Sequence, residues 1–343
     1  MKKLNKKIPV AIIGAGRIGM LLEKDLKRVK PATHFGMWLK NNRANLVAIC
    51  DTDKKNFKFA KKRKKNIKFF ENPKEMILKT KPKIVSISTW KDTHYKICKL
   101  CISMGLKVII LEKPLASSIG QAKKLMKIIK KNKVKLIVNH RRRFDTEIIK
   151  FKNYLRNDLI GKIKQVSCYY VYGLLTTGTH IIDTLRMLLN DIAGEITHVI
   201  GIKNYEKVFK PKDDENYEAF LFFKKGLIVS MQSLNIKDYD IFDCYFYGSK
   251  GKILLTDIGR TVIKYNVHNS PEHTGFTELD NYKPKLISSA FPRKQFKNLG
   301  NNAINCLRKS SNSMCNEIES FYNMKVINAI IKSAKNKSKK IKV

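Results

Sequence analysis

Residues 176–189, TTGTHIIDTLRMLL, place a histidine after a small-residue turn and an aspartate one helical turn later. The dipole at the start of a helix disfavours an imidazolium, so His180 would stay neutral and could accept a proton from a substrate hydroxyl. Asp183 could orient a ring nitrogen of that histidine or hold a substrate hydroxyl. The alternative is a purely structural segment, in which Thr177 or Thr179 caps an ordinary amphipathic helix.

A second candidate is the triplet Glu112-Lys113-Pro114. The proline fixes its own φ and biases Lys113 away from helix, so the turn directs the ammonium group from a rigid base. Burying a lysine charge is costly unless it is compensated, so Lys113 either points into a hydrated cleft or pairs with Glu112. A lysine close to His180 would keep that imidazole neutral and would stabilise a developing alkoxide.

A glycine-rich turn near the amino terminus has the spacing of a dinucleotide-binding motif. The apolar run IPVAII at 8–13 ends in GAGRIG, a helical pattern follows, and the run NLVAIC at 45–50 ends in an acid. In this context the glycines allow a tight turn, a close approach of the backbone to a pyrophosphate, and close packing of helix on strand. The predicted cofactor-binding residues are Gly14, Gly16, Arg17, Ile18, Gly19 and Asp51.

The acid at the end of the second run bears on cofactor choice. Asp51 is placed to accept hydrogen bonds from the adenosine ribose, and its charge would repel a 2′-phosphate, so NAD is favoured over NADP. Lys54 and Lys55 weaken this preference without reversing it.

An unusual excursion separates the glycine turn from the acid. Asp51 follows Gly19 by 32 residues, whereas about 20 residues are usual in this motif. The excess lies around residues 20–36, where Pro31 breaks the first helix. This excursion either helps to cover a substrate or is a surface loop without a role, and His34 within it is left unassigned.

The elements that must position these residues alternate between strands and helices, which indicates a doubly wound parallel sheet. The buried-strand runs are 8–13, 45–50, 83–89, 107–112 and 135–140, and the helical patterns include 92–103 and 117–132. All carboxyl ends of a parallel sheet face one crevice. Polar segments follow three of the strands there: TWKDTH at 89–94, EKPLA at 112–116 and NHRRRF at 139–144.

The last of these segments contains three consecutive arginines, residues 141–143. A charge run of this kind is mostly a solvated face. If Arg143 instead faces the crevice, it could bind an anionic substrate such as a sugar acid or a sugar nucleotide.

The composition is that of a globular protein with an extreme charge. The chain has 343 residues, 43% hydrophobic residues and a net charge of +42. The basic residues are dispersed and mostly lysine, whereas proteins that read nucleic-acid grooves concentrate charge and use arginine. We therefore expect only weak, salt-sensitive attraction to polyanions, and no specific nucleic-acid binding.

Other features favour a cytoplasmic protein. The seven cysteines are scattered, and Cys98 and Cys101 lie in a helical pattern, so we expect buried free thiols and no metal site. No run reaches the length of a membrane span, so no membrane association is expected. The basic start followed by an apolar run resembles a signal peptide, but the run is short and enters the glycine turn, so it is interpreted as a strand.

Taken together, these motifs resemble the Gfo/Idh/MocA family of oxidoreductases over nearly the whole chain. The resemblance rests on GAGRIG with VAICD, VSISTWKDTH, GLKVIILEKPLA and GTHIIDTL, and on the closing VINAIIKSAKNKSKKIKV, which resembles the family's last helix. The resemblance implies an N-terminal Rossmann domain at 1–144 and an α+β domain at 145–310 with a large open-faced, mostly antiparallel sheet. It further implies a C-terminal helix at 311–343 that returns to the Rossmann domain.

The resemblance also implies roles for single residues. Lys113 would contact substrate and cofactor ribose, His180 would be the general base, and Pro114 would be cis. Thr89, His94 and Glu112 would lie near the cofactor, although His94 could instead be structural. Many members form dimers or tetramers through the open face of the sheet, so a homodimer or homotetramer is expected.

Two departures from the family pattern qualify these roles. Many members carry Asp or Asn four residues before the histidine, where this chain has Thr176, which could orient the imidazole or contact substrate but brings no charge. Trp90 replaces a proline beside the cofactor. The leading hypothesis is an NAD-dependent dehydrogenase or reductase acting on a secondary alcohol of a sugar, cyclitol or sugar nucleotide. The alternative is an NAD(P)-binding sensor or partner-binding protein without turnover.

Overall fold

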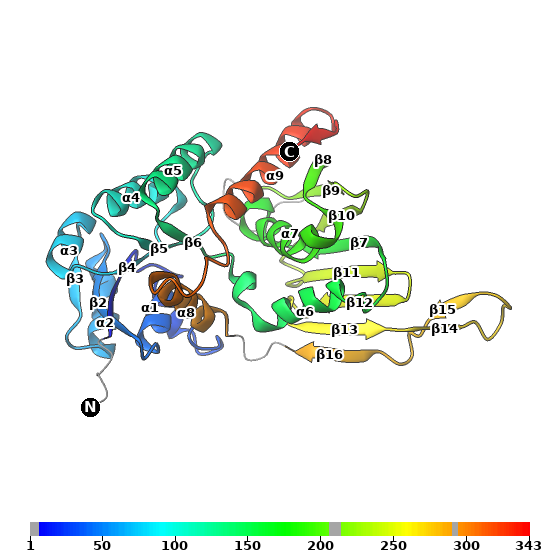
Figure 1. Ribbon diagram of the computed structural model, residues 1–343, viewed down its shortest axis with the longest axis horizontal. Helices are drawn as coiled ribbons and strands as arrows, with labels where there is room; N and C mark the ends of the chain where they lie inside the picture. Colours follow the sequence, from blue (N-terminus) through cyan, green and yellow to red (C-terminus); the bar gives the residue numbers. More distant parts are fainter. Residues whose placement is uncertain (1–6, 206–213, 290–293) are drawn as a thin grey trace. The chain divides into compact units, whose positions relative to one another are not determined.

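The computed structural model describes residues 7–205, 214–289 and 294–343. By its internal contacts the chain divides into two compact units. The first unit comprises Met1–Asp145 and Pro292–Tyr322, and the second comprises Thr146–Phe291 and Asn323–Val343. The two units are described separately below (Figure 1).

The first unit contains a six-stranded, fully parallel sheet in the order β3-β2-β1-β4-β5-β6. Its strands are β1 Ile8–Ile13, β2 Ala44–Cys50, β3 Lys68–Phe70, β4 Ile84–Ile87, β5 Val108–Leu111 and β6 Lys135–Val138. This order is that of a Rossmann fold, in which the strand order reverses beside the first strand. The predicted doubly wound sheet is therefore confirmed. The short β3 has no apolar run to mark it in the sequence.

Helices cover both faces of this sheet. They are α1 His34–Leu39, α2 Phe57–Arg63, α3 Pro73–Thr80, α4 Lys91–Ser103, α5 Ile119–Asn132 and α8 Gln295–Leu307. Local signals fix several of their ends. Asn72 caps α3 ahead of a proline at its first position, and Ser118 accepts the amide of Gln121 to cap α5. The predicted helices at 92–103 and 117–132 correspond closely to α4 and α5.

The predicted helix directly after the glycine turn is replaced by a shorter structure. The chain forms a helical turn and a 3-10 helix, Leu21–Lys24, and only later the short α1. Glu23 explains the fold of the excursion, because its carboxylate accepts the Ala32 amide at 3.0 Å and the Thr33 hydroxyl at 2.8 Å. Residues 34–38 of α1 are all buried. The second part of the excursion, residues 32–38, is therefore packed into the unit, whereas residues 24–28 lie on the surface.

The second unit is built on a nine-stranded sheet in the order β16-β13-β12-β11-β7-β10-β9-β8-β17. Neighbouring strands are antiparallel except for β7 and β10, which are parallel. The strands are β7 Ile163–Tyr170, β8 Ile196–Lys203, β9 Tyr217–Phe223, β10 Ile228–Ser233, β11 Phe242–Gly248, β12 Gly251–Thr256, β13 Thr261–Tyr265, β16 Lys285–Ser289 and β17 Ile341–Lys342. A separate hairpin is formed by β14 Val267–Asn269 and β15 Thr277–Leu279. The predicted large, mostly antiparallel sheet is confirmed.

Within the part of this unit that the structure describes, the helices pack on one face of the sheet and leave the other uncovered. They are α6 Thr146–Arg156, α7 Thr179–Ala193 and α9 Glu317–Lys335, and Figure 1 shows them along one side of the sheet. Burial alternates along β9, where Leu221 and Phe223 are buried and Phe220 is 44% exposed. This alternation is the pattern of a sheet with one packed and one uncovered face.

The C-terminal helix is shared between the units. Residues up to Tyr322 cluster with the first unit, but those from Asn323 onward belong to the second. Their attachment is specific: β17 pairs with β8, and the Ser333 hydroxyl accepts the Gly201 amide at 2.9 Å. This division differs from the expected one, in which the whole of 311–343 returned to the Rossmann domain.

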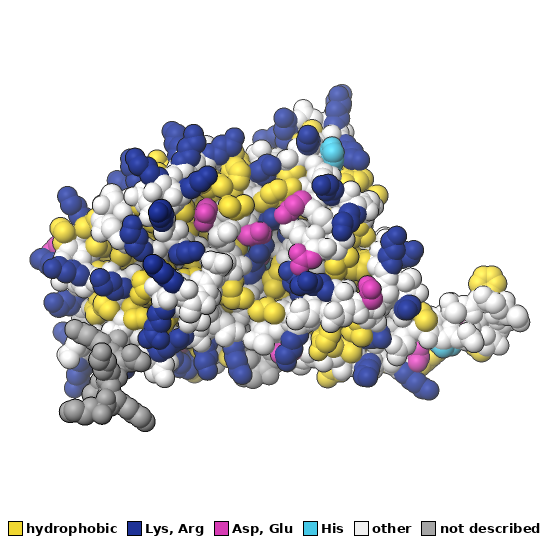
Figure 2. Space-filling model, in the orientation of Figure 1, with side chains coloured by type: hydrophobic (Ala, Val, Ile, Leu, Met, Phe, Trp, Pro, Cys, Tyr) yellow, Lys and Arg dark blue, Asp and Glu magenta, His cyan; other side chains and the backbone are white. Residues whose placement is uncertain are grey.

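The dispersed basic side chains on the surface and the buried free cysteines agree with the expectations from the composition. Figure 2 shows Lys and Arg side chains scattered over the face in view, with few acidic groups between them. All seven cysteines are buried and unbridged, as predicted. None of the helices within residues 7–205, 214–289 and 294–343 has the length and hydrophobicity needed to cross a bilayer.

Candidate active site

The glycines of the turn in the first unit are required for two different reasons: close packing at some positions and open space at another. Gly14 has φ +96°, and a Cβ there would lie 2.7 Å from the backbone of Ser88. Gly19 packs against the Gly14 carbonyl and the Ser88 hydroxyl, where a Cβ would also clash. Gly16 differs, because no heavy atom of the described residues lies within 4 Å of the position of its Cβ. The open space over Gly16 is where a pyrophosphate would approach the backbone.

Asp51 completes this cradle. Its Oδ2 accepts the amide of Ala15 at 2.5 Å, and its Oδ1 accepts the amide of Asp53 at 2.8 Å. The carboxylate thus ties the end of β2 to the glycine turn at a half-buried position. Lys54 could attract a 2′-phosphate, but its Nζ forms an ion pair with Glu71 Oε1 at 2.9 Å. The open turn with an adjacent carboxylate fits the pyrophosphate and ribose of NAD.

The Glu112-Lys113-Pro114 turn is held by a buried histidine on each side of the lysine. His34 of α1 places Nε2 2.8 Å from Glu112 Oε1, and His94 of α4 places Nδ1 2.7 Å from the Pro114 carbonyl. Both histidines are 0% exposed. The Lys113–Pro114 bond is cis, as the resemblance implied. Lys113 itself is half-buried between these two anchors.

His94 therefore lies inside the protein. Its Nε2 is 3.1 Å from the Thr89 carbonyl, so both ring nitrogens face backbone oxygens at the ends of neighbouring strands. Burial lowers the pKa of His94, although the hydrogen bonds to Pro114 and Thr89 act in the opposite direction. These contacts support the structural reading that the sequence left open for His94. Trp90 next to this segment is 84% exposed.

The segment after β6 is buried rather than solvated. Arg142 and Arg143 are only 3% and 8% exposed, so the expectation of a solvated charge run is wrong for both. Arg143 Nη2 pairs with Glu319 Oε2 at 2.8 Å, within the same unit. This partner accounts for a guanidinium in a buried position, and its role in substrate binding stays a prediction.

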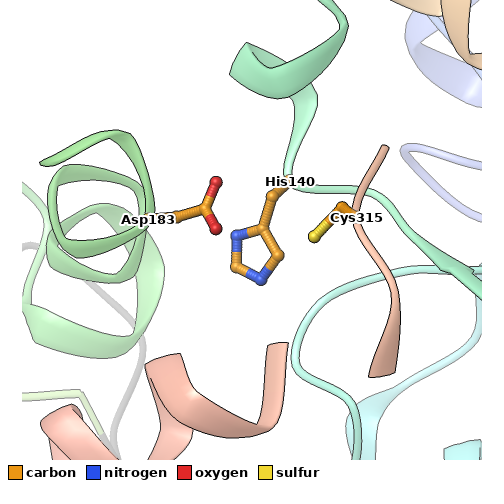
Figure 3. Close-up of side chains that lie close together, drawn as sticks. All are labelled: His140, Asp183 and Cys315. Carbon is orange, nitrogen blue, oxygen red and sulfur yellow. The ribbon is translucent and has the colours of Figure 1, made fainter. Parts of the chain in front are cut away.

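His140 follows β6 directly and was not singled out from the sequence. Figure 3 shows it beyond the strand, with Cys315 on the segment that joins α8 to α9 and Asp183 on α7. Within the first unit, the Val138 amide donates to the Cys315 carbonyl at 2.8 Å, and His140 Nε2 lies 3.5 Å from the Ser320 hydroxyl. The segment before α9 is thereby held alongside β6.

In the second unit, His180 stands one turn further along a helix than expected. A π-helical turn, Leu174–Gly178, runs directly into α7, so His180 lies in the second turn of the combined helix. The helix dipole acts mainly within the first turn, which weakens the expectation that it alone keeps the imidazole neutral. His180 is half-buried. π-helical turns are rare and frequently lie at functional sites.

Asp214 caps this helix, rather than Thr177 or Thr179. Its carboxylate accepts the amides of Leu175 and Thr176, both at 2.7 Å, and Asp214 is 5% exposed. Gly173 has φ +82°, and a Cβ there would lie 2.6 Å from the Asp214 carboxyl carbon. A carboxylate thus does lie beside Thr176, although it comes from a segment 38 residues away. Nothing in the local sequence pattern marks Asp214 for this position.

Asp183 is engaged inside the second unit. It is 1% exposed, and its Oδ1 accepts Asn323 Nδ2 at 2.7 Å. Asn323 in turn accepts Arg186 Nη1 at 2.8 Å, and Arg186 pairs with Glu195. This buried network joins α7 to α9 and supports a structural contribution of Asp183, while a catalytic one stays a prediction.

Comparison with known proteins bears on both units. Residues 8–140 match the family described as an oxidoreductase family with an NAD-binding Rossmann fold, and residues 173–343 match its C-terminal alpha/beta domain. The chain therefore belongs to the Gfo/Idh/MocA family of oxidoreductases. It is an NAD-binding enzyme of the dehydrogenase class.

Several relatives of the chain carry names that state an activity. The chain is 27% identical over 269 residues to an inositol 2-dehydrogenase/D-chiro-inositol 3-dehydrogenase of Shouchella clausii, covering 73% of this chain and 72% of that protein. It is 23% identical over 270 residues to a myo-inositol 2-dehydrogenase of Thermotoga maritima, covering 74% and 77%. The fold resembles that of the WlbA dehydrogenase from Bordetella pertussis, solved with NADH and UDP-GlcNAcA, with a TM-score of 0.76, 18% identity and 98% of each chain covered.

Proposed function

We propose that this enzyme transfers a hydride between the nicotinamide of NAD and a secondary alcohol carbon of a cyclitol, sugar or sugar nucleotide. The observation that carries the proposal is the first unit's cradle, in which open space over Gly16 adjoins the Asp51 carboxylate. The anchored Lys113 turn follows β5, two strands from β1 in the same parallel sheet. Relatives of the chain named as inositol dehydrogenases support the class of substrate.

The protein groups have distinct tasks in this reaction. When bound, NAD accepts or gives the hydride at its nicotinamide ring. A ring nitrogen of His180 takes the proton of the substrate hydroxyl during oxidation and returns it during reduction. The Lys113 ammonium group stabilises the negative charge that develops on the substrate oxygen. Asp214 holds the turn before His180 by accepting the Thr176 amide, and it places a negative charge beside this uncharged residue.

Turnover tests this proposal. Purified protein is incubated with NAD⁺ and a panel of inositols, sugars, sugar acids and UDP-sugars, and absorbance at 340 nm is followed. We expect reduction with at least one cyclitol or sugar, and a loss of kcat of about 100-fold or more in Lys113→Ala and His180→Ala. Lys123→Ala on α5 and His198→Ala on β8 are matched controls and should retain wild-type rates.

The uncharged Thr176, at a position where many family members have Asp or Asn, favours one competing function, that of an NAD-binding sensor without turnover. A protein that binds NAD tightly, shows no turnover with any of these substrates, and is unaffected by Lys113→Ala and His180→Ala would be a cofactor-binding sensor. The same assay with added NADP separates cofactor preference, for which we expect NAD because of Asp51.

Assembly through the open sheet face belongs to the same proposal. The uncovered face carries apolar side chains, of which Phe220 is 44% and Ile228 is 45% exposed. Tyr169 and Tyr245 lie on the same face, with ring centroids 5.7 Å apart. Contiguous apolar surface of this kind is a common interface, so we propose that the chain forms a homodimer or homotetramer.

The buried state of the cysteine thiols indicates the kind of cellular compartment in which the protein works. Burial raises the pKa of Cys50 and of Cys101 to about 12, which disfavours the thiolate, the reactive form of a cysteine. Seven buried, unbridged cysteines support activity in a reducing compartment such as the cytoplasm.

A further inference from the structure

The excursion between the glycine turn and β2 delivers one side chain to the Lys113 turn. His34 begins α1 and is 0% exposed, and its Nε2 lies 2.8 Å from Glu112 Oε1 across 78 residues of sequence. The same carboxylate oxygen accepts Asn139 Nδ2 at 2.6 Å. Glu112 therefore receives two hydrogen bonds from segments far from it in sequence.

The excursion holds His34 in a fixed place. Thr33 caps α1 by accepting the Gly36 amide at 3.0 Å, and Glu23 holds Thr33 in turn. On the same helix, Trp38 Nε1 donates to the Ser86 hydroxyl at 2.8 Å. The His34 ring packs edge-on against Phe296, with centroids 5.5 Å apart. Contacts on all sides restrict the imidazole to one position.

The surroundings of His34 indicate which ring nitrogen donates to Glu112. Its Nδ1 has no hydrogen-bond partner among the residues that the structure describes. Because a carboxylate oxygen accepts hydrogen bonds, the ring nitrogen that faces it, Nε2, carries the proton and donates it in a hydrogen bond to Glu112.

Glu112 is kept ionised by these neighbours. The charged or titratable groups around it are His34 of α1, His94 of α4 and Lys113, and Asn139 adds a neutral donor. Burial alone would raise the pKa of Glu112, but the hydrogen bond and electrostatic attraction of His34, the hydrogen bond of Asn139 and the charge of Lys113 lower it overall. Removing a donor lets the effect of burial prevail.

We propose that His34 is a positioning residue for Lys113, because it fixes the Glu112 carboxylate and with it the turn that carries the lysine. The inference rests on the function proposed above, in which Lys113 contacts the substrate. His94 performs the matching task from the other side by binding the Pro114 carbonyl. The excursion thus serves the reaction from inside the protein, by anchoring the turn, and not as a cover over the substrate.

The first test compares two variants of the same helix. His34→Leu removes the donor to Glu112, and Trp38→Phe removes the other buried hydrogen bond of α1. We expect His34→Leu to lower kcat/KM about 10- to 100-fold, mainly through kcat, because a displaced catalytic group loses rate steeply. His34→Gln keeps a donor near the position of Nε2 and should recover most of this loss. Trp38→Phe should stay within about twofold of wild type even if its Tm falls.

The pH profile adds a readout that a merely structural role would not move. In the wild type, Glu112 stays ionised well below neutral pH, because its pKa is lowered. In His34→Leu its pKa rises, so the acid limb of the kcat/KM profile should shift to higher pH, whereas Trp38→Phe leaves the limb in place. Equal rate losses in the two variants with an unchanged acid limb would overturn the proposal.

A stability cycle keeps this test separate from that of the proposed function. His34→Leu, Glu112→Gln and the double variant are unfolded in urea at pH 7. Because His34→Leu leaves a buried carboxylate with one donor fewer, it should lower the urea midpoint more in the wild type than in Glu112→Gln. Trp38→Phe should cost the same in both backgrounds. If the effects of His34→Leu and Glu112→Gln on the urea midpoint are additive, the proposal that His34 anchors Glu112 is refuted, even if no substrate is found. If the two effects are coupled but no substrate is turned over, only the proposed function is refuted. If His34→Leu does not fold, His34→Asn, whose shorter side chain places no donor at the position of Nε2, replaces it in the cycle and should show the same coupling, and additivity there would refute the anchor.

Discussion

The carboxylate of Asp214 accepts the backbone amide of Thr176 at 2.7 Å, four residues before His180. A buried negative charge therefore lies at the start of the helix that carries the proposed base. The family pattern places an acid or amide side chain on the helix itself, where this chain has a threonine. The connection before β9 supplies the carboxylate instead.

Loss of this carboxylate should affect both stability and rate. Asp214→Ala leaves the partly buried amides of Leu175 and Thr176 without the carboxylate that accepts them, and we expect it to cost about 1–3 kcal/mol of unfolding free energy. Asp214→Asn retains one acceptor, should unfold closer to wild type, and should lower kcat about tenfold through loss of the charge. Urea denaturation and steady-state kinetics measure the two effects. The control is Glu215→Gln, which removes an exposed ion pair with Lys203 and should change neither.

Two glycines of the same turn should respond in opposite ways. Gly16→Ala adds a Cβ in open space, so stability should be unchanged while affinity for NAD⁺ falls about tenfold or more, because the methyl group occupies the pyrophosphate position. Gly14→Ala is strained by φ +96° and by contact with Ser88, so its main effect should be a lower Tm. Calorimetric titration with NAD⁺ and thermal unfolding distinguish these results. An unchanged NAD⁺ affinity in Gly16→Ala would place the cofactor elsewhere.

Asp51 should set both the shape of the turn and the choice of cofactor. Asp51→Asn loses the charge that repels a 2′-phosphate, so the ratio of NADP⁺ to NAD⁺ affinity should rise at least about tenfold. Binding of both cofactors is measured by titration. Asp53→Asn, whose side chain accepts the Lys55 amide, is the neighbouring control and should leave the ratio unchanged.

The open face of the second unit's sheet should control assembly. Phe220→Lys with Ile228→Lys places two charges on that face, and we expect the oligomer to dissociate into monomers. Light scattering after size-exclusion chromatography measures the mass. Leu78→Lys changes an apolar side chain on α3 that is 58% exposed and should leave the mass as it is in the wild type. A wild-type mass for the doubly substituted protein would exclude this face as the interface.

Much of the fold was predictable because its signals are local. The buried runs that became β1, β2 and β4 to β6, and the apolar spacing of α4 and α5, are readable within a few residues. The short strands β3, β14, β15 and β16 have no fully buried position, so they give no such signal. The split of the last helix between two units depends on packing partners, which periodicity does not reveal.

The site was predictable where a motif fixes the backbone and unpredictable where a distant side chain completes it. The glycine turn and the cis proline follow from residue type and order. The carboxylate of Asp214 and the imidazole of His34 reach their partners across 38 and 78 residues. Each partner is an ordinary residue in its own segment, and only the folded chain gives it a role. Arg142 and Arg143 show the converse, since a charge run that looked solvated is buried.

The chain passes between its two units three times, after Asp145, before Pro292 and after Tyr322. The helix α8 therefore completes the Rossmann unit although it is encoded far downstream, and it packs on α1, β5 and β6 with Phe296 and Leu299 buried. A gene fragment that stops at residue 145 would express the nucleotide-binding sheet with this apolar patch bare, and should yield aggregates. Any dissection of the enzyme has to carry residues 292–322 along, joined to the fragment through a linker.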